Sequence, residues 1–143
     1  MASDESVSDK IARLLDSAKS IAVVGIKDHP SEDAFRVSEY MQQAGYRILP
    51  VNPKHASVLG EPCCGDLSGL EQDIDIVNLF RASEHIEAHV DEILALDPAP
   101  KAVWMQLGIH HGPSAQRLRQ AGIEVIQDRC IMVDHRRLLG ESQ

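Results

Sequence analysis

Three residues suited to phosphate binding each stand at the end of a short apolar run in this sequence. Gly25 lies near the end of the run at residues 20–26, Lys54 follows the run at 46–51, and Arg81 follows the run at 74–80. A glycine lets the backbone approach a ligand closely, and Lys and Arg side chains bind phosphate oxygens. If the three runs are parallel strands of one sheet, these residues lie together and predict an anion site.

The residues between these runs predict an alternation of strands and helices. Apolar, often β-branched runs predict five strands, at residues 20–26, 46–51, 74–80, 101–106 and 123–126. Apolar residues spaced three and four apart predict the intervening helices. The residues expected to begin them are Ser6 or Ser8, Ser31 and Ser83 as N-caps, and Pro113 in a first turn.

Five strands alternating with helices predict an α/β fold, a Rossmann-like doubly wound parallel sheet in three layers. Connections between parallel strands are right-handed almost without exception, so few strand orders are possible. We expect the order 3-2-1-4-5, and a flavodoxin-like order is the alternative. The 143 residues, 43% of them hydrophobic, predict one domain over residues 1–143. Its ordered core is expected at about residues 7–139, with a loop at 56–71 and a last short helix at 134–139.

The C-terminal ends of the strands in such a sheet form one rim, where ligands bind. Phe80 is expected to line the pocket for an adenine or its linker, and Arg81 to contact phosphate. The alternative is that Phe80 belongs to the core and Arg81 pairs with Glu84. The rim residues that we predict to bind a cofactor are Gly25, Ile26, Lys27, Asn52, Pro53, Lys54, Phe80, Arg81, Gln106 and Gly108.

The first strand-to-helix loop lacks the fingerprint of ordinary dinucleotide-binding proteins. That fingerprint is G-x-G-x-x-G, whereas residues 25–30, Gly-Ile-Lys-Asp-His-Pro, supply only its first glycine. NAD-binding chains also carry an acidic residue after the second strand, where this chain has Asn52, Pro53 and Lys54. A lysine attracts a phosphate that a carboxylate would repel, which predicts a nucleotide with a phosphorylated ribose. The helix N-terminus near Ser31 offers further N–H groups to a phosphate. The alternative is a glycine that only forms a tight turn and a solvated loop lysine.

Five segments together resemble the small stand-alone CoA-binding proteins, which are similar to the CoA-binding domain of the succinyl-CoA synthetase α subunit. Their Pro-Val-Asn-Pro and Trp-x-Gln-x-Gly patterns are distinctive in combination, and the resemblance covers about residues 10–139. The segments are IAVVG at 21–25, GYRILPVNPK at 45–54, DIVNLFR at 75–81, VWMQLG at 103–108 and DRCIMVDH at 128–135.

This resemblance implies coenzyme A binding, a cytoplasmic location and no established reaction. It implies that the CoA phosphates and adenosine lie over the first two strand ends. The matching positions there are Gly25, Ile26, Lys27, Asn52 and Lys54, and Phe80 and Arg81 match the third-strand segment. Lys27 departs from the small residue that such proteins often carry, so it either adds a phosphate contact or obstructs the groove.

Cys130 and His135 are the candidates for catalysis. Cys130 follows the fifth strand beside Arg129, and positive neighbours favour the thiolate. The thiol chemistry that this favours is exchange with CoA or an acyl-carrier role, and a half-buried structural cysteine is the alternative. No metal site is predicted, because the H-x-E-x-H at residues 85–89 is not the zinc-protease pattern and Cys63-Cys64 lack nearby partners.

Composition narrows the classes of function. The net charge of −8 disfavours binding to nucleic acid or to an anionic membrane, since both need a basic face. Three cysteines, two of them adjacent, favour free thiols in a reducing cytoplasm. We therefore expect a cytoplasmic binding or regulatory module for CoA or acyl-CoA. The alternatives are an NADP-type oxidoreductase or a CoA-dependent thiol enzyme using Cys130. A third possibility is a regulatory subunit with a vestigial pocket, and a protein partner or homo-oligomer stays open.

Overall fold

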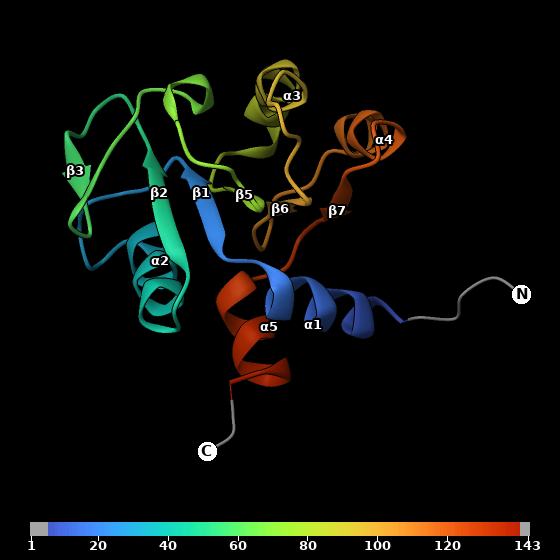
Figure 1. Ribbon diagram of the computed structural model, residues 1–143, viewed down its shortest axis with the longest axis horizontal. Helices are drawn as coiled ribbons and strands as arrows, with labels where there is room; N and C mark the ends of the chain where they lie inside the picture. Colours follow the sequence, from blue (N-terminus) through green and yellow to red (C-terminus); the bar gives the residue numbers. More distant parts are fainter. Residues whose placement is uncertain (1–5, 141–143) are drawn as a thin grey trace, which may run out of the picture.

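A five-stranded parallel sheet lies at the centre of the computed structural model, which describes residues 6–140. Helices α1, α2 and α5 cover one face of the sheet, and α3 and α4 cover the other (Figure 1). The predicted three-layer α/β fold is confirmed. The strands are β1 (Ser20–Val24), β2 (Arg47–Val51), β5 (Ile76–Leu79), β6 (Ala102–Met105) and β7 (Glu124–Ile126). The helices are α1 (Val7–Ser17), α2 (Asp33–Gln43), α3 (Ile86–Leu94), α4 (Gly112–Gln120) and α5 (Ile131–Leu138).

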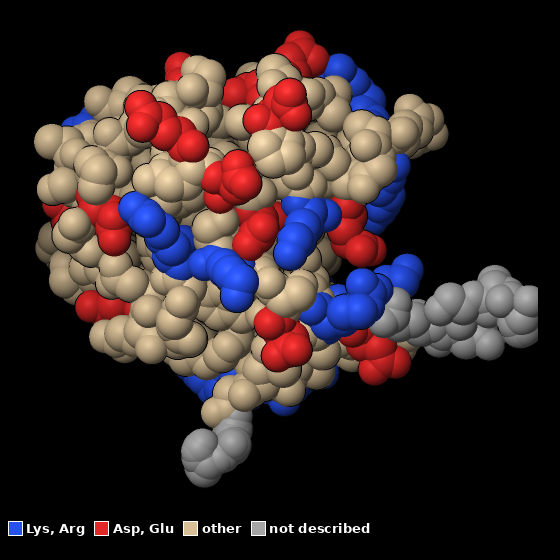
Figure 2. Space-filling model, in the orientation of Figure 1, with Lys and Arg blue, Asp and Glu red and all other residues tan. Residues whose placement is uncertain are grey.

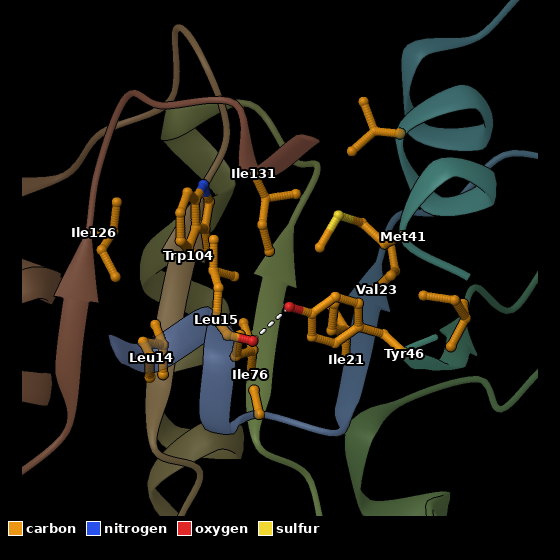
Figure 3. Close-up of a cluster of buried hydrophobic side chains, with 14 of the residues drawn as sticks. Leu14, Leu15, Ile21, Val23, Met41, Tyr46, Ile76, Trp104, Ile126 and Ile131 are labelled. Carbon is orange, nitrogen blue, oxygen red and sulfur yellow. Dashed lines mark hydrogen bonds between the residues drawn. The ribbon is translucent and has the colours of Figure 1, made fainter. Parts of the chain in front are cut away.

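Successive residues of each central strand supply two separate cores. In β1, Ile21 and Val23 pack on the α1, α2 and α5 side, whereas Ala22 and Val24 pack on the other. All five residues of β1 are buried, which is why the strand is a continuous apolar run instead of an alternating one. Figure 3 shows the first core, where the Tyr46 hydroxyl donates to a carbonyl oxygen of α1.

The strand order is β2-β1-β5-β6-β7, which is 2-1-3-4-5 when the strands of this sheet are counted along the chain. The expected order 3-2-1-4-5 is therefore wrong, and the flavodoxin-like alternative is the one observed. Pro50 supplies a physical reason, because it has no N–H to offer a further strand. Its carbonyl faces the outer edge of β2 and accepts from the Cys64 N–H at 3.1 Å. The third strand of the sheet pairs with β1 instead of with this edge.

The segment expected to be a loop at residues 56–71 contains a small hairpin. Strands β3 (Ser57–Val58) and β4 (Glu61–Pro62) pair through a turn at Leu59 and Gly60, both with positive φ. A short 3₁₀ turn, η1 (Leu67–Gly69), follows. The hairpin leads the chain back along β2, where the Asn52 N–H donates to the Cys64 carbonyl at 2.9 Å.

The helix ends differ in part from expectation. Ser6 is confirmed as the N-cap of α1, since its hydroxyl accepts from the Asp9 N–H at 3.0 Å. Ser31 is not a cap: α2 begins two residues later, with Glu32 at the capping position. Ser83 is not one either, because it lies in a 3₁₀ turn, η2 (Ser83–His85), before α3. Its hydroxyl accepts instead from the His110 N–H.

The last two helices agree in part with the predictions. Pro113 is confirmed in the first turn of α4, and α5 begins three residues earlier than expected. None of the helices in residues 6–140 is long and apolar enough to cross a membrane.

Candidate functional site

The sheet changes its direction of growth between β1 and β5. The chain moves from β1 to β2 on one side and then returns to place β5 on the other. In sheets of this kind the crevice beyond the C-terminal strand ends at such a point is the usual ligand site. Here the crevice lies among the ends of β1, β2 and β5.

Gly25 joins these three strand ends. Its N–H donates to the Val51 carbonyl at 3.0 Å, while the Phe80 N–H donates to the Val24 carbonyl at 2.9 Å. Its φ of +85° lies in the left-handed region, and a Cβ there would stand 2.5 Å from the Phe80 carbonyl oxygen. Only glycine therefore fits this turn without moving the end of β5.

Asn52 connects the end of β2 to the end of β1. Its side chain is buried, its Nδ2 donates to the Ile26 carbonyl at 2.7 Å, and its Oδ1 accepts from the Lys54 N–H at 2.8 Å. These two bonds use the amide's donor and acceptor at once. They fix the backbone that carries Lys54 next to the turn at Gly25.

Three basic side chains from three strand ends line one cavity of about 270 Å³. Lys27, Lys54 and Arg81 are all exposed, and none forms an ion pair within residues 6–140. Arg81 lies over the turn at Gly25, since its Cδ is 3.2 Å from where a Cβ on that glycine would stand. Glu84, the alternative partner of Arg81, instead faces His85 at 3.8 Å.

The chain carries a net charge of −8, so acidic residues outnumber basic ones. Figure 2 shows Lys and Arg side chains in a broken band across the middle of the visible face, with acidic side chains beside them. Unlike Arg36, Arg117 and Arg129, which form ion pairs, the three cations that line the cavity form none within residues 6–140.

The cavity brings together seven of the ten predicted binding residues. Those in its lining are Gly25, Lys27, Asn52, Pro53, Lys54, Phe80 and Arg81. The other three lie apart from it. Ile26 is fully buried, and Gln106 is buried against Asn78, with their side chains 3.0 Å apart. The Gly108 N–H donates to the Asp128 carboxylate at 2.6 Å.

Sequence reasoning missed the part of the cavity wall that does not come from the strand ends. That wall includes Asp66, which precedes η1, and His89 and Glu92 on α3. Glu92 Oε2 accepts from the Leu67 N–H at 2.7 Å, and its Oε1 lies 3.3 Å from His89 Nδ1. The three-residue spacing of His89 and Glu92 places them on one helix face and was the available signal. Val24, Val51 and Gly65 complete the lining.

Cys130 and His135 do not form a pair like that of a thiol enzyme. His135 Nδ1 lies 2.9 Å from the Tyr40 hydroxyl, and burial lowers the pKa of the imidazole. Arg129, expected to activate the thiol, binds the buried Asp134 through two bonds of 2.7 and 3.0 Å. The hydrogen bond to this carboxylate raises the pKa of Arg129. Its charge is thus compensated by Asp134, and Cys130 stands half-buried at the N-cap position of α5.

Two other clusters were singled out in the sequence, the Cys63-Cys64 pair and the histidines at residues 85 and 89, and neither forms a metal site within residues 6–140. Cys63 is half-buried, and burial, followed by the nearby Asp28 and Cys64, raises the pKa of its thiol. Across residues 6–140 no three His, Cys, Asp or Glu side chains are grouped so that they could hold a metal ion.

Comparison with known proteins finds a matching family and several similar proteins. The family described as "CoA binding domain" matches residues 19–136. An uncharacterized protein, YneT of Bacillus subtilis (strain 168), is 41% identical over 126 residues, covering 88% of this chain and 92% of that protein. A Thermus thermophilus structure, cell-free ID.343, is 39% identical with a TM-score of 0.89, covering 94% of this chain and 100% of that one. A hypothetical protein from Pyrococcus horikoshii OT3 is 31% identical with a TM-score of 0.89, covering 96% and 95%.

Proposed function

The chain belongs to the CoA binding domain family, and we propose that its cavity at the ends of β1, β2 and β5 binds the nucleotide part of coenzyme A. The observation that carries the proposal is the convergence of Lys27, Lys54 and Arg81 around the turn at Gly25. Cations that form no ion pair within residues 6–140, beside a close-packed glycine turn, suit a ligand that carries several phosphate groups.

The side chains that line the cavity suit the phosphate groups of CoA. Lys27, Lys54 and Arg81 would hold phosphate oxygens, because each supplies N–H donors with a full positive charge. Phe80 and Val51 offer apolar surface within the same lining. A volume of about 270 Å³ is below the usual range for a site that encloses a whole cofactor. The proposal is therefore for the nucleotide part of CoA.

We propose a binding or regulatory role. Bound CoA or acyl-CoA supplies a thiol or thioester, and the chain's own residues in the cavity bind and orient the nucleotide. Asn52 fixes Lys54, and Gly25 permits the approach of Arg81. A cytoplasmic location, where CoA and free thiols occur together, belongs to the same proposal.

Titration calorimetry with CoA, acetyl-CoA, NADP and NAD tests this function. We expect CoA and acetyl-CoA to bind and NAD not to bind. Binding of NADP without CoA would contradict the proposal and favour the oxidoreductase alternative, and binding of no nucleotide would contradict it as well.

A charge reversal at Lys54 identifies the phosphate that this residue contacts. Lys54→Glu is expected to weaken CoA by about tenfold or more, and dephospho-CoA by less than about threefold, because only CoA carries the ribose 3′-phosphate. Lys10→Glu, an exposed residue of α1, makes the same change of charge away from the cavity. Equal losses for the two ligands would show that Lys54 does not contact the 3′-phosphate.

A further inference from the structure

The lining of the cavity carries charges of both signs, and the two signs come from different elements of the chain. Asp66 and Glu92 form its acidic wall, opposite in charge to Lys27, Lys54 and Arg81. No ion pair in residues 6–140 joins the two sets, although both line one cavity. A ligand that fits both walls must therefore itself have an anionic end and an end that suits carboxylates.

Glu92 is held in place by two contacts of its carboxylate. The backbone N–H of the fully buried Leu67 donates to Oε2 at 2.7 Å. His89 Nδ1 lies 3.3 Å from Oε1, and only 18% of the His89 side chain and 22% of the Glu92 side chain are exposed. The other ring nitrogen of His89 is buried with no hydrogen-bond partner among the described residues, so Glu92 is the polar anchor of this imidazole. His89 is thus a positioning residue for Glu92.

Asp66 is fixed in a similar way on the neighbouring segment. Its Oδ1 accepts from the Ser68 hydroxyl at 2.7 Å and from the Gly69 N–H at 3.2 Å. The acidic wall therefore comes from two short elements, η1 and α3, which are tied together by the bond between Leu67 and Glu92. Both carboxylates therefore accept hydrogen bonds from within the chain.

The chemistry of this wall specifies what part of a ligand lies against it. An ionised carboxylate accepts hydrogen bonds and donates none, and it repels phosphate. The ligand part that contacts these carboxylates must bring N–H or O–H donors, and Val24, Val51 and Phe80 in the same lining offer apolar surface for a flat ring. An aminopurine base has both properties.

We propose that Glu92, oriented by His89, selects a base with an exocyclic amine in the bound nucleotide. This inference rests on the proposed function, because it assigns the base to the acidic wall and the phosphates to the basic one. Hydrogen bonds to a charged group are the stronger kind, so loss of the amine is expected to weaken binding by about tenfold or more.

The experiment compares adenosine 3′,5′-bisphosphate with the 3′,5′-bisphosphate of purine riboside, which lacks only the amine. For the native chain we expect the first to bind about tenfold tighter by calorimetry. Glu92→Gln keeps the shape and an acceptor for the Leu67 N–H, but adds donors to the wall. It should reduce the ratio of the two affinities to less than about threefold.

Glu87→Gln is the matched control, because this exposed residue lies on the same helix and outside the cavity lining. It should leave the ratio unchanged, and His89→Phe, which removes the contact to Glu92, should lower the ratio. Equal binding of the two probes to the native chain would overturn this inference while leaving CoA binding intact. A ratio changed as much by Glu87→Gln as by Glu92→Gln would overturn it too. Failure of both probes and of CoA to bind would overturn the proposed function together with it.

Discussion

Replacing Gly25 by alanine tests whether the strand ends are packed as closely as the site requires. The φ of +85° costs about 1–2 kcal/mol for a residue with a Cβ. The new Cβ would also stand 2.5 Å from the Phe80 carbonyl oxygen and 3.2 Å from Arg81 Cδ. Forcing extra volume into a packed position costs about 1–3 kcal/mol. The two costs together predict a loss of about 2–5 kcal/mol in the free energy of unfolding.

Gly122→Ala provides the matched control for this measurement. Gly122 has almost the same φ, +86°, but a Cβ there meets nothing within 4 Å. Chemical denaturation should therefore show a loss of only about 1–2 kcal/mol for this variant. The difference between the two variants, about 1–3 kcal/mol, isolates the contact with the end of β5.

The same variants should differ in ligand binding. Because the clash in Gly25→Ala is with the backbone that leads into Arg81, CoA affinity should fall along with stability, whereas Gly122→Ala should keep it. Equal losses of stability in the two variants would refute the argument that β1 and β5 approach each other closely at this turn.

Further predictions concern the other buried polar groups. Burial raises the pKa of Tyr46 to about 12, so ultraviolet titration of the native chain should show one of its two tyrosines ionising late. The free energy of unfolding should then fall above about pH 10, where the unfolded phenol already ionises; an absorbance change complete near pH 10 in the folded chain would contradict this. Burial lowers the pKa of His135, so below about pH 6.5 the unfolded chain binds the proton first and stability falls. His135→Asn should flatten this part of the pH profile, and an unchanged slope would count against it. Asn52→Ala removes bonds to the Ile26 carbonyl and the Lys54 N–H, and denaturation should show a loss of about 1–3 kcal/mol with weaker CoA binding. A variant as stable as the native chain would show that Asn52 does not connect the strand ends.

Much of the fold was predictable because the strands are buried on both faces. The run at 20–26 is continuous and apolar, and β1 is buried along its whole length. The strand order was not predictable from periodicity, which reports burial and not the neighbour of a strand. Pro50 was the available clue, since a strand that lacks an N–H on one side suits the edge of a sheet.

The capping errors have a common cause. Ser31 and Ser83 both precede apolar helical patterns, which is the usual signal for an N-cap. In the structure Ser31 bonds to His29, and the Ser83 hydroxyl accepts from the His110 N–H on a distant loop. Serine hydroxyls often form such alternative bonds, and their partners become visible only once the loops are placed in space.

The basic side of the cavity followed from the rule for strand ends, but its acidic wall did not. Lys27, Lys54 and Arg81 each lie two or three residues after the end of a strand. Asp66 comes from the connection between β2 and β5, and Glu92 lies in the middle of a helix. Their placement depends on how η1 and α3 pack over the sheet, through a contact between Leu67 and Glu92 that lie 25 residues apart.

A crystal structure of the chain with CoA tests the central claim most directly. We predict phosphate groups within hydrogen-bonding distance of Lys54 and Arg81 at the Gly25 turn, and the base against Glu92. CoA bound away from the ends of β1, β2 and β5, or bound there with its phosphates remote from these two side chains, would contradict the account.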